Sequence, residues 1–317
     1  MKKRYYQKNE KLAIQKFNIW LKAFRLRTLP LALANAVMGS FLAMAEGAFK
    51  WEVFILTVFT ITFLQILSNL ANDYGDGVSG KDTANRLGPQ RVTVSGLVSR
   101  SEMKWMISMF ILLSLASGTT LIVYALQDVP LKSILLFFAL GLAAIVAAIK
   151  YTVGKNPYGY KGLGDIYVFV FFGLVGVIGT YYMHTNWFDV HVVIPAMIIG
   201  LFSTAVLNIN NLRDIASDTE TGKKTLAVQF GLNFARTYHL VLIFSAWAFA
   251  LIYTMFYYNS HWQWMFLLTL PLFIINSKRV YFHRSASELN NELKNLAFSS
   301  FLSVSYTHLT LPTKRIV

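Results

Sequence analysis

The sequence predicts an all-α protein, a polytopic transmembrane helical bundle, and three observations support this fold class. Of the 317 residues, 55% are hydrophobic and only 14% are charged, whereas soluble domains carry about 25% charge. Apolar runs that approach the length needed to cross a bilayer, about 20 residues, recur along the whole chain. Lysine and arginine gather in every second connecting segment, as in proteins that cross a membrane repeatedly.

The apolar runs predict eight spans and part of a ninth. The expected spans are 28–45, 52–76, 105–126, 130–150, 165–184, 191–212, 238–258 and 262–277. A ninth begins near Leu296, but the apolar stretch that ends at Ser303 is too short to cross a bilayer. We therefore expect about nine helices, with the last one truncated.

The basic residues predict the orientation of the bundle. The N-terminal segment and the loops 77–104, 150–164, 213–236 and 278–294 carry most of the lysine and arginine, and the remaining turns carry one or none. By the positive-inside rule these segments, including the N-terminus, are cytoplasmic. The net charge of +14 then reflects topology and contact with anionic lipid, and binding to nucleic acid is a poor fit. The absence of cysteine excludes disulfides and Cys-ligated metals.

Composition divides the chain into three segments. Residues 1–24 form a basic cytoplasmic N-terminal segment, and residues 25–303 form the transmembrane domain. The string Val-Ser-Tyr-Thr-His-Leu-Thr-Leu-Pro-Thr from Val304 to Thr313 resembles a translated sequencing adapter. We therefore expect residues 304–317 to be a non-native tail without a functional role.

Two acidic clusters lie at the ends of the second and sixth predicted spans. Each cluster places its members at helical spacing: Asn69, Asn72, Asp73 and Asp76 in the first, and Asn210, Asn211, Asp214 and Asp218 in the second. One charged side chain at the bilayer centre costs about 2.5–3.5 kcal/mol. The cost falls near a helix end, but clusters this dense still indicate a function.

Both clusters have the chemistry of a magnesium site. Mg²⁺ is bound in proteins through one or two carboxylates together with substrate phosphates. The clusters lie on the same side of the membrane, four spans apart, which suggests an internal repeat whose halves face a shared cavity. Two such clusters could hold metal ions on either side of one diphosphate. Helix-end solvation by Asn, Asp and Gly would explain one cluster, but it explains two matched clusters less well.

At these residues the sequence resembles the UbiA superfamily of intramembrane prenyltransferases. Asn72-Asp73-Tyr-Gly-Asp76 is similar to the first Asn-Asp-x-x-Asp motif of that family, and Asp214-x-x-x-Asp218 is similar to its second motif. One position departs from the pattern. The family motif continues to an Asp four residues after Asp76, where this chain has Gly80, and Asp82 follows instead.

This variant resembles one branch, the 1,4-dihydroxy-2-naphthoate polyprenyltransferases of menaquinone biosynthesis. The segments that carry the narrower resemblance are 27–30, 69–97, 151–165 and 210–227, and the likeness covers about residues 20–300. It implies a lateral cavity that opens to the cytoplasmic side. It also implies transfer of a polyprenyl chain from polyprenyl diphosphate to dihydroxynaphthoate, with loss of CO₂ and diphosphate.

The resemblance implies roles for single residues as well. The expected Mg²⁺ ligands are Asn72, Asp76, Asp214 and Asp218. The expected catalytic residues are Asp73, Asp76, Asp214 and Asp218. The expected substrate-binding residues are Arg27, Asn69, Asp82, Arg91, Tyr151, Lys161, Asn210 and Lys223. Metal ions and basic side chains would neutralise the leaving diphosphate, and the electron-rich ring would then attack the allylic cation.

Two alternatives stay open at this stage. Another aromatic acceptor, 4-hydroxybenzoate or homogentisate, would fit the same superfamily, but Gly80-Lys81-Asp82 and the loop 86–91 argue against it. A secondary transporter would also carry intramembrane acids and repeats, usually near mid-membrane, whereas these acids lie at one end. In the fifth span, Gly173, Gly176 and Gly179 favour close helix packing over room for a prenyl tail.

Overall fold

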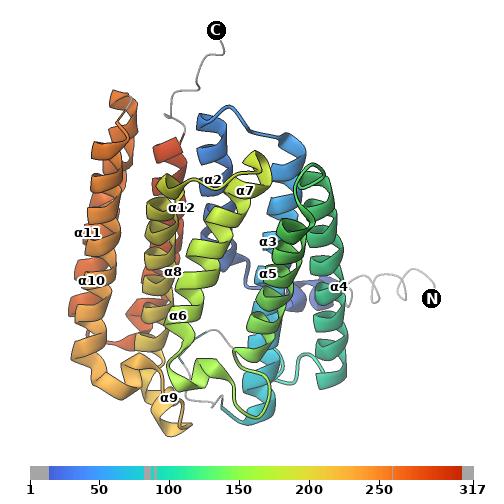
Figure 1. The fold of residues 1–317 in the computed structure, drawn as a ribbon. Coiled ribbons are helices and arrows are strands. Elements are labelled where there is room, and N and C mark those ends of the chain that lie inside the picture. The colour runs from blue at the N-terminus through green and yellow to red at the C-terminus, as the bar shows by residue number, and fades with distance from the viewer. Residues whose placement is uncertain (1–13, 82–86, 89–90, 259, 309–317) are drawn as a thin grey trace, which may run out of the picture.

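A computed structural model describes residues 14–81, 87–88, 91–258 and 260–308, and all regular structure in these residues is helical. Residues 14–24 are helical. The elements that follow are η1 (Leu26–Thr28), α2 (Leu29–Ala45), α3 (Trp51–Ser79), α4 (Arg100–Ala125), α5 (Leu131–Lys150), η2 (Tyr158–Lys161), α6 (Gly164–Val168), η3 (Phe169–Ile178), α7 (Gly179–Thr185), η4 (Val190–Val192), α8 (Val193–Arg213), α9 (Ile215–Glu220), α10 (Leu226–Phe256), η5 (His261–Thr269), α11 (Leu270–Phe282), η6 (Ala286–Glu288) and α12 (Leu289–His308). They form one bundle of long, roughly parallel rods (Figure 1).

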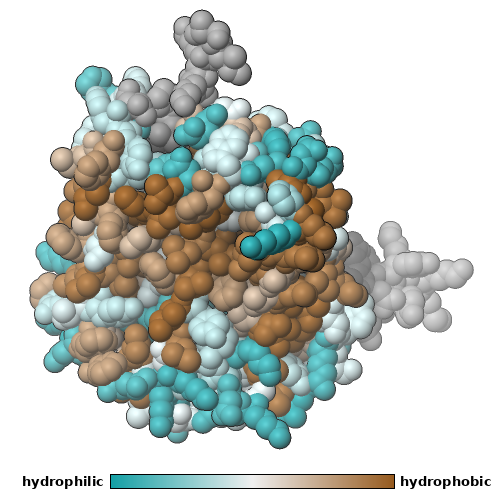
Figure 2. All heavy atoms as spheres, in the orientation of Figure 1, coloured by the Kyte–Doolittle hydropathy of each residue, from teal (hydrophilic) through white to brown (hydrophobic). Residues whose placement is uncertain are grey.

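Within the described residues, eight helical stretches are long and apolar enough to cross a membrane. They are Ile14–Ala45, Trp51–Ser79, Arg100–Ala125, Leu131–Lys150, Gly164–Thr185, Val190–Arg213, Leu226–Phe256 and His261–Phe282. A band of hydrophobic side chains crosses the middle of the visible face, and hydrophilic side chains gather at both ends (Figure 2). The chain is therefore a multi-pass membrane protein.

Six of the predicted spans agree with the structure to within five residues at each end. The first and seventh helical stretches begin earlier than predicted, because their first turns carry polar residues that interrupt the apolar run. The seventh, α10, begins at Leu226, where the Thr225 side chain accepts a hydrogen bond from the Val228 N–H (3.4 Å). Gly231, with φ of 86°, then bends the chain before the apolar part of the helix. The ninth helix, α12, starts at Leu289, ahead of the predicted position.

The packing joins segments that are distant in sequence. α3 packs against α4 and α5, whereas α8 packs against α10, α12 and the fifth span, which consists of α6, η3 and α7. α12 also lies against α2, so the last helix closes the bundle onto the first span. The end of α3, which carries the first acidic cluster, and the short α9, which carries Asp218 of the second, both lie at the lower end in Figure 1. The fold therefore places both clusters on one side of the membrane.

The fifth span contains a π-helical segment, η3, and one of its glycines packs directly on α8. A Cβ on Gly173 would lie 2.6 Å from the Ala196 carbonyl oxygen and 2.7 Å from the Gly200 Cα. Both neighbours are backbone atoms that cannot move aside locally. Gly173 therefore has the packing role that the sequence suggested, whereas Gly176 and Gly179 line the cavity described below.

Replacing Gly173 with alanine should destabilise the bundle by about 1–3 kcal/mol, because the added methyl group overpacks the contact between the fifth span and α8. The measurement is the thermal unfolding of the detergent-purified protein. Gly179→Ala is the matched control, because its Cβ would come no closer than 3.8 Å to a neighbour, the Phe137 ring. A Gly173→Ala protein as stable as the control would contradict this contact.

Candidate active site

A cavity of about 400 Å³ lies inside the bundle, lined by α2, α3, α4, α5, the fifth span and α8. On α3 its lining runs from Thr57 to Asp76. The 19 steps between these two residues correspond to about 28 Å of helix at 1.5 Å per residue, so the cavity extends through most of the thickness of a bilayer. Its α5 wall includes Phe137 and Gly141, and its fifth-span wall includes Phe171.

The cavity is polar at one end and mainly apolar along the rest of its length. The polar end is lined by side chains from both acidic clusters and the loops around them: Asn69, Asn72, Asp76, Arg91, Tyr151, Tyr160, Asn210, Asn211, Asp214, Asp218 and Lys223. The apolar part is lined mostly by aliphatic and aromatic side chains of the spans, with scattered amide and hydroxyl groups. This distribution suits a ligand with a charged head and a long hydrocarbon tail.

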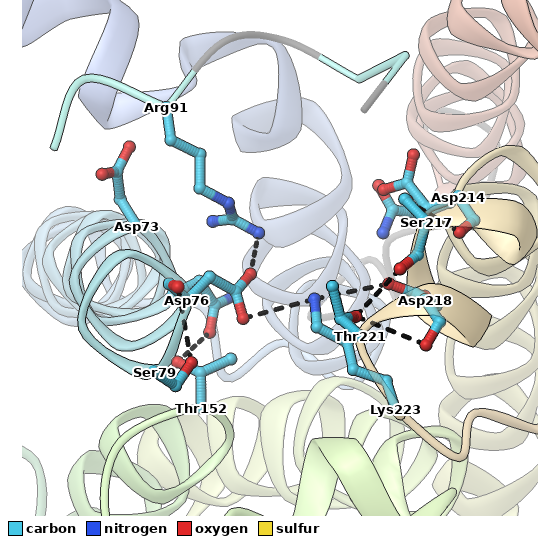
Figure 3. A network of polar contacts seen from close by, with 12 residues as sticks. Asp73, Asp76, Ser79, Arg91, Thr152, Asp214, Ser217, Asp218, Thr221 and Lys223 are labelled. Carbon is cyan, nitrogen blue, oxygen red and sulfur yellow. Dashed lines mark hydrogen bonds and ion pairs between the residues drawn. The ribbon is translucent and has the colours of Figure 1, made fainter. Parts of the chain in front are cut away.

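Asp76 is the centre of the polar end (Figure 3). Its carboxylate is almost fully buried and forms an ion pair with Arg91. The Tyr160 hydroxyl donates a hydrogen bond to the same carboxylate. Burial, and then the nearby Asp76 charge, raise the pKa of Tyr160 above its ordinary value, so the hydroxyl remains a donor. A single carboxylate therefore collects donors from two separate loops.

Lys223 joins the two acidic clusters. Its ammonium lies 3.3 Å from Asp76 Oδ1 and 3.4 Å from Asp218 Oδ1 (Figure 3). The backbone holds it there, because the Lys223 N–H donates to the Asp218 carbonyl at 2.9 Å. Around it, the Lys224 N–H donates to the Tyr160 carbonyl at 2.9 Å, and Lys81 Nζ donates to the Thr221 carbonyl. Three loops therefore meet over the polar end of the cavity.

Asp73 does not line the cavity, although it lies only three residues from Asp76. Its carboxylate accepts hydrogen bonds from the backbone N–H groups of Val92 (3.1 Å) and Thr93 (3.0 Å). In Figure 3 it points towards the segment that carries Arg91. Asp73 thus anchors the loop that brings Arg91 to Asp76.

Local sequence explains how α3 fits this site. A Cβ on Gly75 would lie 2.6 Å from Thr152 Oγ1, so glycine lets the segment after α5 approach the helix. The Thr152 hydroxyl donates to Asn72 Oδ1 at 3.2 Å. Gly80, the position where the family motif has an Asp, ends α3 in the left-handed region with φ of 65°, and its N–H donates to the Asp76 carbonyl. Glycine is the residue that adopts this conformation most readily.

The second cluster lies where α8 gives way to α9. Asp214 forms the break between the two helices, with φ −94° and ψ 7°, and Asp218 lies one turn further along. Burial raises the pKa of Asp218 to about 6, Lys223 opposes this shift, and the carboxylates of Asp214 and Asp76 add to it. Burial is the main cause of this shift, so a cation bound beside Asp218 would favour its charged form.

The remaining predicted residues fall into three groups. Asn69, Tyr151 and Asn210 line the cavity, and the Asn69 amide donates to the Phe24 carbonyl at 2.9 Å. Arg27 and Lys161 are not among the lining residues. Asp82 lies outside the described residues.

One basic residue that the sequence did not indicate lines the cavity. Arg25 has a left-handed backbone (φ 50°, ψ 52°) between the helical segment 14–24 and η1. Its carbonyl accepts hydrogen bonds from the N–H and the hydroxyl of Thr28, both at 2.9 Å. Helical periodicity cannot predict which of Arg25 and Arg27 faces the cavity, because the helix is interrupted at Arg25. A basic residue two positions before Arg27 was the only available signal.

The donor set fits a divalent cation that is shared with a phosphate ligand. No group of three or more acidic or imidazole side chains is close enough to hold a metal alone, within the part of the chain that the structure describes. Instead, one ammonium bridges Asp76 and Asp218, which marks a position between the clusters where positive charge is stabilised. Mg²⁺ commonly takes one or two carboxylates and completes its shell with phosphate and water.

Comparison with known proteins identifies the family. The model of the UbiA prenyltransferase family matches residues 32–303. The chain belongs to the UbiA prenyltransferase family. The 1,4-dihydroxy-2-naphthoate octaprenyltransferase of Haemophilus influenzae is 44% identical to this UbiA enzyme over 93% of this chain and 96% of that protein. The protein of the same name from Escherichia coli is 43% identical over 84% of this chain and 86% of that protein.

The fold agrees with this assignment. A solved UbiA homologue from Archaeoglobus fulgidus, bound to GPP and Mg²⁺, has a TM-score of 0.64 to this UbiA enzyme. The sequences are 15% identical, and the match covers 92% of this chain and 99% of that chain. The resemblance predicted from the two acidic clusters is confirmed, and so is the all-helical transmembrane bundle.

Proposed function

We propose that this UbiA enzyme transfers a polyprenyl chain from polyprenyl diphosphate to 1,4-dihydroxy-2-naphthoate, with loss of CO₂ and diphosphate, giving demethylmenaquinone. The observation that carries the proposal is the convergence of Asp76 and Asp218, from two helices far apart in sequence, on one ammonium at the head of an apolar cavity. The acceptor follows from the two relatives that are 44% and 43% identical, both 1,4-dihydroxy-2-naphthoate octaprenyltransferases.

The charged end of the cavity would bind the diphosphate. Asp76 and Asp218 would hold Mg²⁺ together with Asn72 and Asp214, and bound Mg²⁺ supplies Lewis acidity at the phosphate oxygens. Arg91 and Lys223 already lie at this carboxylate pair. They would donate to the oxygens of the leaving group, where negative charge grows as the allylic C–O bond breaks.

The allylic cation left by ionisation would react with the electron-rich ring of the acceptor. A new C–C bond forms at the ring carbon that carries the carboxylate, and the carboxylate leaves as CO₂ with its bonding electrons returned to the ring. Water must be kept away from this cation. The loops that meet over the polar end, joined by the Lys81–Thr221 and Lys224–Tyr160 contacts, would exclude it.

The prenyl tail would lie in the apolar part of the cavity, which we place open sideways to lipid and towards the cytoplasmic side. Gly141 on α5 tests this placement, because it lines the cavity and a Cβ there meets no atom within 4 Å. Gly141→Leu should narrow the tail region without straining the fold and shift the preference towards shorter prenyl diphosphates. The measurement is the ratio of kcat/KM for octaprenyl and farnesyl diphosphate. Ala139→Leu, at an exposed position of α5 that does not line the cavity, should leave the ratio unchanged.

We place the enzyme in the cytoplasmic membrane with its N-terminus and the diphosphate site on the cytoplasmic face. The excess of lysine and arginine in the N-terminal segment and in the loops at this end supports the orientation. We keep the division into a basic segment (1–24), the enzyme domain (25–303) and a non-native tail (304–317), although α12 crosses the last boundary, since it runs to His308 and buries Val304. Protease access to a tag at the N-terminus in inverted vesicles, and no access in intact cells, would support the orientation.

The deciding experiment offers the purified protein, in detergent with Mg²⁺, farnesyl diphosphate and one acceptor at a time. Dihydroxynaphthoate should be consumed with equal amounts of CO₂ and diphosphate released. Consumption of 4-hydroxybenzoate or homogentisate alone would contradict the acceptor. Turnover in detergent requires no membrane gradient, so it would also exclude transport as the primary activity.

A further inference from the structure

Arg213, the last residue of α8, is almost completely buried, and all three nitrogens of its guanidinium group donate hydrogen bonds. Nε donates to Asp214 Oδ1 and one terminal nitrogen donates to Asp214 Oδ2, both at 2.8 Å. The same terminal nitrogen donates to Asn210 Oδ1 at 2.6 Å, and the other donates to Asn290 Oδ1 at 3.2 Å. A planar group with five fixed donors is suited to such an arrangement, and lysine is not.

The pairing of Arg213 with its direct neighbour requires a break in the helix. Side chains at i and i+1 do not face each other on a regular α-helix. Here α8 ends at Arg213, and Asp214 takes a non-helical backbone before α9 begins. The break turns the Asp214 carboxylate back onto the guanidinium. The orientation of this carboxylate in the second cluster is therefore fixed by Arg213.

Arg213 also supports the loop that follows the first cluster and carries Arg91. A Cβ on Gly88 would lie 2.7 Å from a terminal nitrogen of Arg213 and 3.0 Å from its Cζ, so Gly88 rests directly against the guanidinium. Asn290 of α12, which accepts from Arg213, donates in turn to the Leu87 carbonyl at 3.2 Å. Three residues beyond Gly88 lies Arg91, the partner of Asp76.

We propose that Arg213 is a positioning residue that couples the two acidic clusters: it fixes the Asp214 carboxylate and, together with Asn290, supports the Leu87-Gly88 segment, three residues before the Arg91 that pairs with Asp76. The proposal rests on the proposed function, because it assumes that both clusters hold one prenyl diphosphate. Arg213 has no role in the chemical step. It sets the distance between two groups of ligands that must act on the same diphosphate.

The test compares Arg213→Lys and Asn290→Ala with the control Arg279→Lys. Arg279 also contacts α12, through Glu292 at 3.1 Å, but its side chain is 61% exposed and lies outside the cavity lining. The primary readout is the dissociation constant of farnesyl diphosphate with Mg²⁺, measured without acceptor. The second is the rise in unfolding temperature that this ligand produces. Both report ligand binding independently of turnover.

Arg213→Lys should weaken binding of farnesyl diphosphate by about tenfold or more. A lysine keeps the charge but cannot make the set of charge-assisted hydrogen bonds that the guanidinium makes to Asp214 and Asn210. Asn290→Ala should weaken it severalfold, and Arg279→Lys should change it less than twofold. The ligand-induced rise in unfolding temperature should shrink in the first two variants only. Unchanged binding in both, or a lower unfolding temperature with an undiminished ligand-induced rise, would overturn the proposal, since either result indicates a purely structural role.

A double substitution tests whether Gly88 acts through Arg213. If it does, Gly88→Ala should weaken binding in the wild-type background but add little to Arg213→Lys, since both disturb one contact. Fully additive effects would overturn the coupling. A wild-type protein that binds farnesyl diphosphate but uses no dihydroxynaphthoate would contradict the proposed acceptor and leave this proposal standing. A wild-type protein that does not bind farnesyl diphosphate would overturn both.

Discussion

Asp76→Asn should reduce kcat for prenyl transfer by about 10²–10³-fold or more, the loss seen when one group that stabilises transition-state charge is removed. The side chain keeps its shape but loses the charge on which Arg91 and Lys223 converge. The NH₂ group of the new amide is itself a donor, so it cannot accept the hydrogen bonds that the neighbouring basic side chains now donate to Asp76. The measurement is single-turnover product formation at saturating Mg²⁺ and prenyl diphosphate, with insertion checked by purification yield.

Asp189→Asn is the matched control for this substitution. Asp189 lies at the start of η4, where its carboxylate accepts from the His191 N–H at 3.0 Å, away from the cavity lining. Its replacement should leave kcat unchanged. Near-normal turnover of Asp76→Asn at saturating Mg²⁺ would refute the role of this carboxylate.

Lys223→Gln should lower both the catalytic efficiency and the stability of the ligand-free protein. With substrate present, kcat/KM for prenyl diphosphate should fall by about 10²-fold, because a cation that would meet the leaving group is lost. Without metal or substrate, the protein should unfold at a lower temperature, because Asp76 and Asp218 lose the ammonium that they share. Added Mg²⁺ should then stabilise the variant more than it stabilises the wild type, because no internal ammonium competes for the same carboxylates.

Lys224→Gln is the neighbouring control. The Lys224 side chain is exposed, and its contact with the Tyr160 carbonyl is made by the backbone N–H, which the substitution keeps. We expect wild-type kcat/KM and wild-type stability. If Lys223→Gln behaved like Lys224→Gln in both assays, Lys223 would contribute only to the general positive charge of this loop.

The spans and the meeting of the two acidic clusters could be predicted because both follow from periodic patterns. Apolar length identifies a span, and equal position at the ends of the second and sixth spans brings Asp76 and Asp218 to one side of the membrane. The roles of Asp73 and Asp76 could not be separated in this way. Three residues on a helix differ by about 60° around its axis, so one carboxylate faces the cavity while the other reaches the Val92 and Thr93 N–H groups.

Contacts that depend on irregular backbone also escaped prediction. Arg25 lines the cavity and Arg27 does not, because the left-handed residue at position 25 interrupts the helical register. The pairing of Arg213 with Asp214 depends on a helix break that neither residue type predicts. The contact between Gly88 and Arg213 joins segments about 125 positions apart. Local sequence patterns do not predict contacts between residues so far apart in the chain.

The length of the apolar part of the cavity has a consequence for how this enzyme meets its substrate. The cavity extends about 28 Å along α3 in all, so its apolar part can hold a length of hydrocarbon chain while the head group stays at the polar end. The donor and the product then need never leave the lipid phase. The quantity that governs saturation is the mole fraction of prenyl diphosphate in the membrane. Diluting a fixed amount of substrate with inert lipid or detergent should therefore slow the enzyme, even at constant bulk concentration.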